Sequence, residues 1–557
     1  MTGNRQVAFL CATLVLIVSG TGCSEGRPAD QCPTPKSGLD QVVFESVPYT
    51  SAHNKPDHTA WGINMRKIAR IGDRVYSYYI DNRDYCQVTP SEPWIPDCAV
   101  TGGTGWSHAQ VLIKRADEPW AELAGLRAVT VRPGNLLVDP VSQCLHMFVF
   151  APHTSLSARQ SDGIGSLRHY YVSATDPTLG WSAETIVAQP PSPGDSETAN
   201  IRVGASIAPD GRIVVAWGSY TDGNSMNVRV GDGAGCGKSW SSPQVEAGLQ
   251  HQYYYPRVHV GGLVATDPAS AVLGEPTQQH YTAILAQMDE ELTDCDGEPT
   301  ESIYRKARYW EDSRDGDFAG DTLVNLWSPC NPSYDRVNHT EAYIDSASRT
   351  HVIFTKLANC ASSSGGCAAQ QLEHWYKPGD SFHHGAGPGQ WTKKILLNWG
   401  AEAGDCPNHV NLGVNEVRLV EADTNGDGEQ ELFYVAVSNA KLYLARFDET
   451  RDFLCSNDLH ELAPAEGWPS HWGGLRAYVA GRGGGTLLAE RFVDILLFSR
   501  TGSDAGGDAA TATRYIRIPD EVLPELLGEV APGEPDAGPG GDAAAGGSMD
   551  SSVCQRR

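Results

Sequence analysis

The chain has 557 residues, 40% of them hydrophobic, and a formal net charge of −26. This length is enough to bury a large hydrophobic core. The acidic balance opposes nucleic acid and anionic membrane surfaces as partners, because both are polyanions. The same charge keeps a protein soluble and also suits the binding of calcium. We expect a monomer.

The first 23 residues have the pattern of an export signal. Arg5 precedes an apolar run at 7–18, which is too short to span a membrane as a helix, and small residues at 19–22 lead to Cys23. The pattern resembles a bacterial lipoprotein signal. That resemblance implies that 1–23 is a signal peptide, that Cys23 carries a lipid, and that 24–38 is a tether at the outer membrane or cell surface. The alternative is ordinary cleavage, which leaves Cys23 for a disulfide in a periplasmic or secreted protein.

Cysteine usage agrees with export. Of 14 cysteines, one lies within the signal and Cys23 is the proposed lipid site, so an even number remains. In an exported chain this pattern is typical of disulfides. Local spacing favours the pairs Cys86–Cys98 and Cys360–Cys367, because each closes a short loop of the kind that joins strands. No group of cysteines and histidines has the spacing of a zinc site.

The interior repeats one strand-like phrase seven times, at gaps of about 54 to about 84 residues. The repeats begin near Trp61, Arg132, Asn200, Tyr254, Asn338, His409 and Gly473. Each unit reads as four short strands rich in β-branched and aromatic residues, with turn signals such as Asp210-Gly211 between them. Four-stranded units that repeat radially make a β-propeller.

We therefore predict an all-β fold over 39–530, a seven-bladed β-propeller of four-stranded blades. The strand-like run at 41–49 has no unit of its own, and we expect it to close the ring by pairing with the last blade. A linear solenoid is the alternative architecture, but it needs capping ends that the chain does not show. Residues 531–557 are rich in Gly, Pro, Ala and Asp and are expected to be disordered.

Aspartate- and tryptophan-bearing turns recur in the middle units. Asp176, Gly180 and Trp181 form one such turn, and the segment from Asp232 to Trp240 forms another. These turns resemble the Asp-box of sialidase-like (BNR repeat) propellers, a structural device that lies away from the active face in that family. The resemblance implies a propeller in which the aspartate binds turn amides and the tryptophan packs into the blade.

The sixth unit carries a different loop. Oxygen-bearing side chains occupy alternate positions at Asp423, Asn425, Asp427, Glu429 and Glu431, and a strand follows. Alternate oxygen ligands with a glycine at the sixth position are typical of a loop that wraps calcium. The loop resembles the calcium site of FG-GAP (VCBS) repeats, which implies one structural calcium ion. The alternative is an Asn/Gly/Asp-rich turn that holds no ion.

Polar residues near the starts of the repeats are the candidates for a binding or catalytic site, because the first strands of propeller blades line the central channel. They are His58, Arg202, Tyr255, Arg257, His339, Glu341 and His409. Arginine, histidine and tyrosine together suit an acidic sugar, since guanidinium groups bind carboxylates in bidentate fashion.

The sequence leaves three functional interpretations open. The first is a cell-surface propeller that recognises carbohydrate or a surface protein, with one calcium as a brace. The others are enzymes on the same scaffold: a sialidase-like glycoside hydrolase, with Arg202 and Arg257 on the substrate carboxylate, or a polysaccharide lyase with a histidine or tyrosine base. The fold alone does not decide between them.

Overall fold

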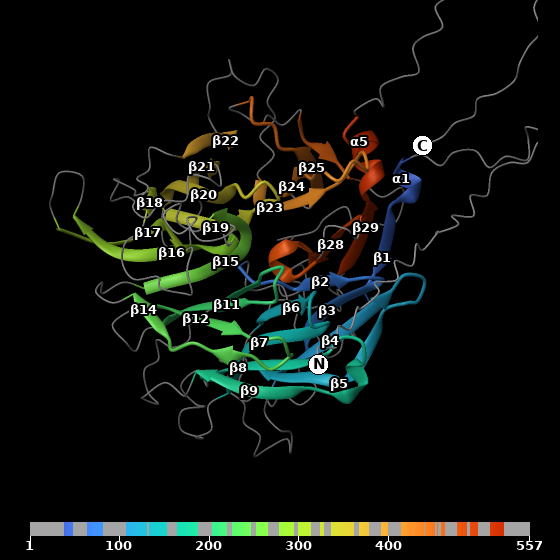
Figure 1. The fold of residues 1–557 in the computed structure, drawn as a ribbon. Helices are drawn as coiled ribbons and strands as arrows, with labels where there is room; N and C mark the ends of the chain where they lie inside the picture. Colours follow the sequence, from blue (N-terminus) through green and yellow to red (C-terminus); the bar gives the residue numbers. More distant parts are fainter. Residues whose placement is uncertain are drawn as a thin grey trace, which may run out of the picture.

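The computed structural model describes a body made almost entirely of β-strands (Figure 1). The described residues are 38–47, 64–81, 107–130, 133–152, 164–187, 203–219, 225–246, 252–265, 278–293, 299–312, 324–327, 336–360, 367–377, 391–398, 414–438, 441–451, 454, 458–462, 476–486, 491–498 and 513–528. Within these ranges, no helix is both long enough and apolar enough to cross a membrane.

Six sheets follow one another along the chain. The first sheet contains β2 (Ile68–Ile71), β3 (Arg74–Asp81), β4 (Ser107–Arg115) and β5 (Ala121–Thr130). The second contains β6 (Asn135–Asp139), β7 (Cys144–Pro152), β8 (Ile164–Ser173) and β9 (Ser182–Val187). The third contains β10 (Val203–Ile207), β11 (Ile213–Ser219), β12 (Ser225–Asp232), β13 (Ser239–Trp240) and β14 (Gln244–Glu246).

The fourth sheet is eight-stranded. It contains β15 (Gln252–Ala265), β16 (Gln278–Thr293), β17 (Pro299–Asp312), β18 (Val324–Trp327), β19 (Arg336–Ile344), β20 (Thr350–Cys360), β21 (Cys367–Lys377) and β22 (Thr392–Asn398). Two antiparallel runs meet in it where Arg305 of β17 pairs in parallel with Arg336 of β19. The prediction of seven separate blades is therefore wrong, since the long strand β17 reaches β19 and joins two of the predicted units into one sheet.

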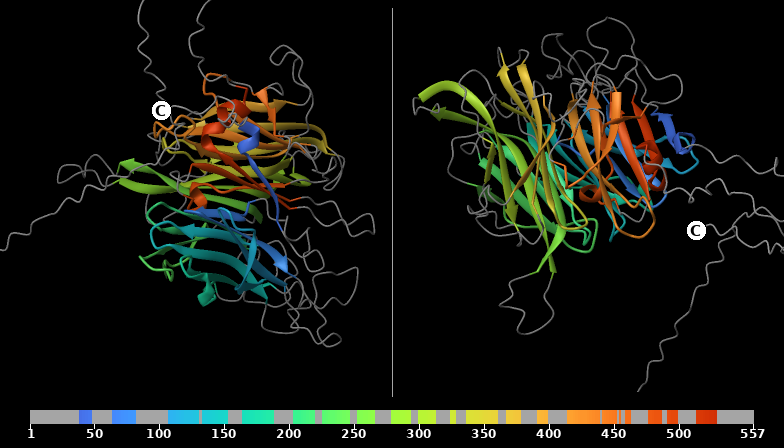
Figure 2. Two further views of the ribbon diagram at one scale, coloured as in Figure 1. Left: turned by 90° about the vertical axis from the view of Figure 1, so that its right-hand side faces the viewer. Right: turned by 90° about the horizontal axis from the view of Figure 1, so that it is seen from above.

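The last two sheets close the ring. The fifth contains β23 (Val414–Ala422), β24 (Glu431–Ser438), β25 (Lys441–Arg446) and β26 (His460–Glu461). The sixth contains β27 (Arg476–Val479), β28 (Phe492–Phe498), β29 (Arg514–Pro519) and β1 (Val43–Ser46). β1 pairs antiparallel with β29, as predicted for the N-terminal strand, and in Figure 2 the blue first strand lies against the red last sheet.

The first strand of each antiparallel run lies toward the middle of the body, and the later strands lie toward its edge (Figure 1). Neighbouring first strands contact one another in the order β2, β6, β10, β15, β19, β23 and β27, and β27 contacts β2 again. This closed circuit of first strands makes the body a β-propeller. The helical elements are short, namely α1 (Gly38–Gln41), η2 (Pro177–Leu179), η8 (Arg482–Gly484), η10 (Asp520–Val522) and α5 (Leu523–Leu526).

The hydrophobic core is divided into clusters that lie between consecutive sheets. Between the first and second sheets, Tyr76, Val111, Leu136 and Met147 are buried together. Because each sheet packs against a neighbour on both faces, its inner strands are buried along their whole length, as in β2 and β6, where every residue is buried. Polar side chains on these strands are therefore buried as well and need partners inside the body.

The two aspartate turns lie between β8 and β9 and between β12 and β13. In the second sheet, Thr178 Oγ1 donates to Asp176 Oδ1 at 2.5 Å, and Gly180 has a positive φ of 76°. In the third, the ring centroid of Trp240 lies 6.0 Å from that of Phe148 in the second sheet. The second turn therefore connects two neighbouring sheets.

Candidate functional site

One end of the ring is defined by the starts of the first strands. Asn64 Nδ2 donates to Val203 O at 3.2 Å and to Pro256 O at 2.9 Å, and Asn135 Nδ2 donates to Val203 O at 2.8 Å. Residues that precede or begin β2, β6, β10 and β15 therefore lie at the same end. The predicted site residues also precede or begin first strands, so the sequence predicts a site at this end of the ring.

A layer of charged side chains fills the ring just inside this end. Arg257 Nε donates to Glu341 Oε1 at 2.5 Å, and Arg418 Nη1 donates to Glu341 Oε2 at 2.9 Å. Arg418 Nη2 also donates to Glu416. We call this group the central charged layer, and its members are Lys67, Arg257, Glu341, Glu416, Arg418 and Arg476.

The electrostatics of the layer keep Glu341 ionised. Burial opposes the ionisation of Glu341, but the guanidinium groups of Arg257 and Arg418 outweigh it and hold the pKa of Glu341 below its ordinary value. Burial lowers the pKa of Lys67 well below its ordinary value, and Glu416 offsets only part of this. Lys67 Nζ lies 4.6 Å from the ring centroid of Tyr478.

Among the residues that the structure describes, the layer contains more basic than acidic groups. Four of its members are basic and two are carboxylates, and five of the six are at most 5% exposed. Directly below it, Arg66 donates to Ala205 O at 3.2 Å and to Val258 O at 3.0 Å, which adds another buried cation. A buried excess of positive charge is unfavourable without an anion to balance it. It also contrasts with the strongly acidic chain as a whole.

The opposite end of the ring is closed by the loop 481–486, which contains η8. Ser206 Oγ donates to Gly483 O at 2.9 Å, and Arg70 N donates to Thr486 Oγ1 at 3.1 Å. A Cβ atom at Gly483 would overlap the guanidinium group of Arg66, and one at Gly485 would overlap Val138 O. Glycine is therefore required at positions 483 and 485 for the loop to fit inside the ring.

The structure brings together two of the predicted site residues, Arg257 and Glu341. Tyr255 lies two residues before Arg257, is half-buried, and has a positive φ of 51° at a break in the β15–β16 register. Bulges and left-handed non-glycine residues concentrate at functional sites. His58, Arg202 and His409 lie outside the described residues, and so does the side chain of His339, whose backbone belongs to β19.

Sequence reasoning missed the partners of Arg257 and Glu341. Lys67, Glu416 and Arg418 are buried charges within or beside strands that are otherwise apolar. That pattern, a charge placed where the strand must face the core, is the signal that identifies them. It is visible in the run 65–71 and in the run 414–420.

The predicted calcium loop is a tight turn between β23 and β24. Asp423 accepts from Gly426 N at 2.6 Å and from Gly428 N at 3.1 Å, and Asn425 Nδ2 donates to Asp427 Oδ2 at 2.9 Å. Glu431, by contrast, lies 3.3 Å from the guanidinium of Arg446. Glu429 donates its backbone N–H to Asp427 Oδ1 at 2.8 Å.

The oxygen atoms of this loop that could bind a cation are only partly arranged for it. The side chains of Asp423, Asn425 and Asp427 share the loop, whereas Glu431 pairs with an arginine. Within the described ranges, no group of three or more His, Cys, Asp or Glu side chains is arranged to hold a metal ion. Calcium binding therefore stays a prediction.

One disulfide joins the second and third sheets. Cys144 at the start of β7 is bonded to Cys236 in the turn after β12, with the Cα atoms 5.4 Å apart. Beside it, Lys238 Nζ lies 2.9 Å from Asp139 Oδ2, and both side chains are buried. The disulfide between Cys144 and Cys236 was not predicted.

The predicted cysteine pairs fall partly outside the described residues. Cys360 and Cys367 face each other in the register of β20 and β21, but their side chains lie outside the description. Cys86, Cys98 and the predicted lipid site Cys23 also lie outside it. Those pairings and the lipidation stay predictions.

Comparison with known proteins gives no family assignment. No family model and no curated protein matches the chain. Solved structures that resemble it include an ulvan lyase from a polysaccharide lyase family, at a TM-score of 0.46 and 10% identity, covering 87% of this chain and 99% of that one. Another is the SapL1 lectin in complex with alpha methyl fucoside, at a TM-score of 0.31 and 9% identity, covering 70% of this chain and 95% of that one. A third is the β-propeller domain of the Trilobed protease from Pyrococcus furiosus, at a TM-score of 0.27 and 9% identity, covering 71% of this chain and 96% of that one. At these scores the likenesses carry no argument about what this chain binds.

Proposed function

We propose that the protein is a recognition propeller that binds an anionic ligand, of the acidic carbohydrate class, at the end of the ring where the first strands begin. The observation that carries this is the excess of buried basic side chains in the central charged layer of a chain whose net charge is −26. A carboxylate or sulfate group of a ligand would add negative charge beside these basic side chains, and guanidinium groups bind such groups in bidentate fashion.

The state of Glu341 argues against one catalytic role for this residue. A general acid must hold a proton near neutral pH, which requires a raised pKa. Glu341 instead lies between Arg257 and Arg418, and its pKa is lowered. Glu341 is thus held ionised and paired with two arginines, so we assign it no role as a general acid.

Tyr255 allows recognition to be separated from stability. Its left-handed backbone strains a side chain with a Cβ by about 1–2 kcal/mol, and glycine removes that strain. Since this relieved strain offsets part of the lost packing, we expect Tyr255→Gly to stay folded and to bind acidic polysaccharide more weakly. Ser348→Gly, with φ of 60° in the turn between β19 and β20, is the matched control that relieves strain without affecting binding.

The binding experiment compares acidic polymers (polyglucuronate and a sulfated glycan) with neutral dextran at several salt concentrations. The proposal requires binding to an acidic polymer that weakens as salt rises, and a lower affinity in Tyr255→Gly but not in Ser348→Gly. Equal affinity for dextran, or an unchanged affinity in Tyr255→Gly, refutes it.

We further propose that the protein is exported and anchored by a lipid on Cys23, as the resemblance of its first 23 residues implies. Labelling with a radioactive fatty acid should mark the wild type and not Cys23→Ala. In this proposal the loop of Asp423, Asn425 and Asp427 holds a calcium ion that braces the turn between β23 and β24, with no part in recognition.

A further inference from the structure

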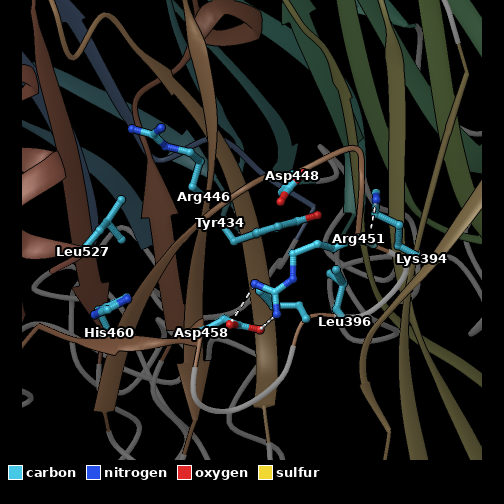
Figure 3. A pocket seen from close by; sticks show the side chains of 10 residues that line it. Lys394, Leu396, Tyr434, Arg446, Asp448, Arg451, Asp458, His460 and Leu527 are labelled. Atoms are coloured by element: carbon cyan, nitrogen blue, oxygen red, sulfur yellow. Dashed lines mark hydrogen bonds and ion pairs between the residues drawn. The ribbon is translucent and has the colours of Figure 1, made fainter. Parts of the chain in front are cut away.

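A cavity of about 220 Å³ lies away from the ring centre, between the outer strands of the fourth and fifth sheets (Figure 3). Leu396 of β22 and Tyr434 of β24 form part of its wall, and Arg451 and Asp458 lie on the connection between β25 and β26. The volume is below the range of about 300–1,000 Å³ typical of pockets for drug-sized ligands. It therefore limits an occupant to about one ring.

A chain of buried hydrogen bonds begins at Tyr434. Its hydroxyl lies 2.7 Å from His374 Nδ1, and His374 Nε2 lies 2.9 Å from His351 Nδ1. His351 Nε2 in turn lies 3.0 Å from Asp345 Oδ2. Both histidines are 0% exposed.

One placement of protons that satisfies every bond in this chain starts from Asp345. Asp345 also accepts from Arg349 and has a lowered pKa despite its burial, so it is ionised and accepts from His351 Nε2. His351 Nδ1 then accepts from His374 Nε2. His374 Nδ1 accepts from Tyr434, whose proton points away from the cavity. The tyrosine oxygen is left with lone pairs and acts only as an acceptor toward any further partner.

The rest of the cavity wall provides both donors and acceptors in fixed positions. Arg451 forms a two-point ion pair with Asp458, with both N–O distances 2.9 Å. Asp448 is held through Oδ1 by Thr450 N at 2.8 Å. Apolar surface comes from Leu396 and Leu527. Figure 3 shows Tyr434 lying among the polar side chains of Asp448 and Arg451.

We propose that this cavity is a binding site for a single sugar residue or a compact polyol of the same size, with the oxygen of Tyr434 as a fixed acceptor for one ligand hydroxyl. A polyol matches the wall because it presents several hydroxyls that both donate and accept, together with an apolar ring face. His374, His351 and Asp345 are positioning residues that hold the tyrosine proton away from the ligand.

The second sheet offers a matched control. His146 Nδ1 lies 2.8 Å from His169 Nε2, and His169 Nδ1 lies 2.5 Å from Glu184 Oε1. These histidines lie on the second and third strands of their sheet, as His351 and His374 lie on the second and third strands of the run β19–β22, with the same sequence separation of 23. Neither His146 nor His169 lies near the cavity of Tyr434, so this pair serves as a structural counterpart.

The experiment measures binding of glucose, galactose, glucuronate and myo-inositol to the full chain by saturation-transfer NMR and calorimetry. We expect at least one of these four probes to bind in the millimolar range. Tyr434→Phe, which removes only the oxygen, should weaken that binding about tenfold, an effect typical of a lost specific hydrogen bond. His374→Phe should weaken it, and His374→Asn, which restores an acceptor near the Nδ1 position, should recover part of the loss.

The control is His169→Phe, which should destabilise the protein about as much as His374→Phe does but leave the affinity unchanged. Should Tyr434→Phe fail to fold, Arg451→Ala decides the same question, because this half-exposed side chain can be removed without opening the core. The proposal is overturned if none of the four probes binds, or if Tyr434→Phe or its substitute binds as tightly as the wild type. Tyr255→Gly should leave binding to this cavity unaltered, so the result is independent of the site at the ring centre.

Discussion

The disulfide between Cys144 and Cys236 should be a major source of stability. The two cysteines are 92 residues apart, and no other cysteine lies between them, so breaking the bond releases the whole segment in the unfolded chain. Loop-closure entropy for about that many residues corresponds to roughly 4.5 kcal/mol at 25 °C. Replacing both residues in Cys144→Ala/Cys236→Ser should therefore lower the free energy of unfolding by about 2–5 kcal/mol, the range typical of native disulfides.

The assay is urea unfolding followed by tryptophan fluorescence, which Trp240 beside the disulfide turn should report. Non-reducing peptide mapping first establishes that the wild type contains the Cys144–Cys236 cross-link. Lys238→Gln is a separate control, since it removes the neighbouring ion pair with Asp139 and leaves the bond in place. A confirmed cross-link whose removal changes the free energy of unfolding by less than about 1 kcal/mol would refute the reasoning.

Three further predictions follow from the buried charges and the calcium loop. Glu341→Gln removes the carboxylate that pairs with Arg257 and leaves Arg418 paired with Glu416, so it should destabilise the protein by about 3–5 kcal/mol in urea unfolding, whereas a loss below about 1 kcal/mol contradicts the central charged layer. Burial lowers the pKa values of His146 and His374, so the unfolded chain binds more protons than the folded protein below about pH 6.5. The free energy of unfolding should therefore be constant above that pH and fall below it. A flat profile down to about pH 5 would be inconsistent with neutral buried histidines. EDTA should lower the Tm of the wild type and not that of Asp427→Ala, and equal melting with and without EDTA in the wild type counts against bound calcium.

The sequence was sufficient for much of the architecture. Repeated four-strand units with turn signals predicted a β-propeller, and the unassigned strand-like run at 41–49 predicted that β1 closes the last sheet. Both depend on local periodicity and on counting strands. The fusion of β15–β22 into one sheet was not predictable, because a single parallel pair between Arg305 and Arg336 leaves no pattern in the sequence.

The candidate site was predictable only in its location. The starts of the first strands do meet at one end of the ring, and Arg257 and Glu341 do lie together there. Their pairing with Arg418 depends on how adjacent sheets are rotated against each other, which local spacing does not encode. The disulfide between Cys144 and Cys236 was missed for the same reason, because local spacing favoured pairs that close short loops. The role proposed for Tyr434 was also beyond the sequence, because it depends on two histidines from the neighbouring sheet.

The pairing of β1 with β29 has a consequence for how the protein is made. Val43 is among the first residues of the ring to be synthesised and Arg517 among the last, so the final sheet stays incomplete until nearly the whole chain has been delivered. Until then β1 and β28 lack their shared partner β29, and such open edges are the kind of surface on which chains aggregate. Folding must therefore end with the capture of a four-residue strand from the far end of the chain, a contact of very high sequence separation and a natural slow step. Shortening the segment before β1 should affect the yield of folded protein more than its final stability.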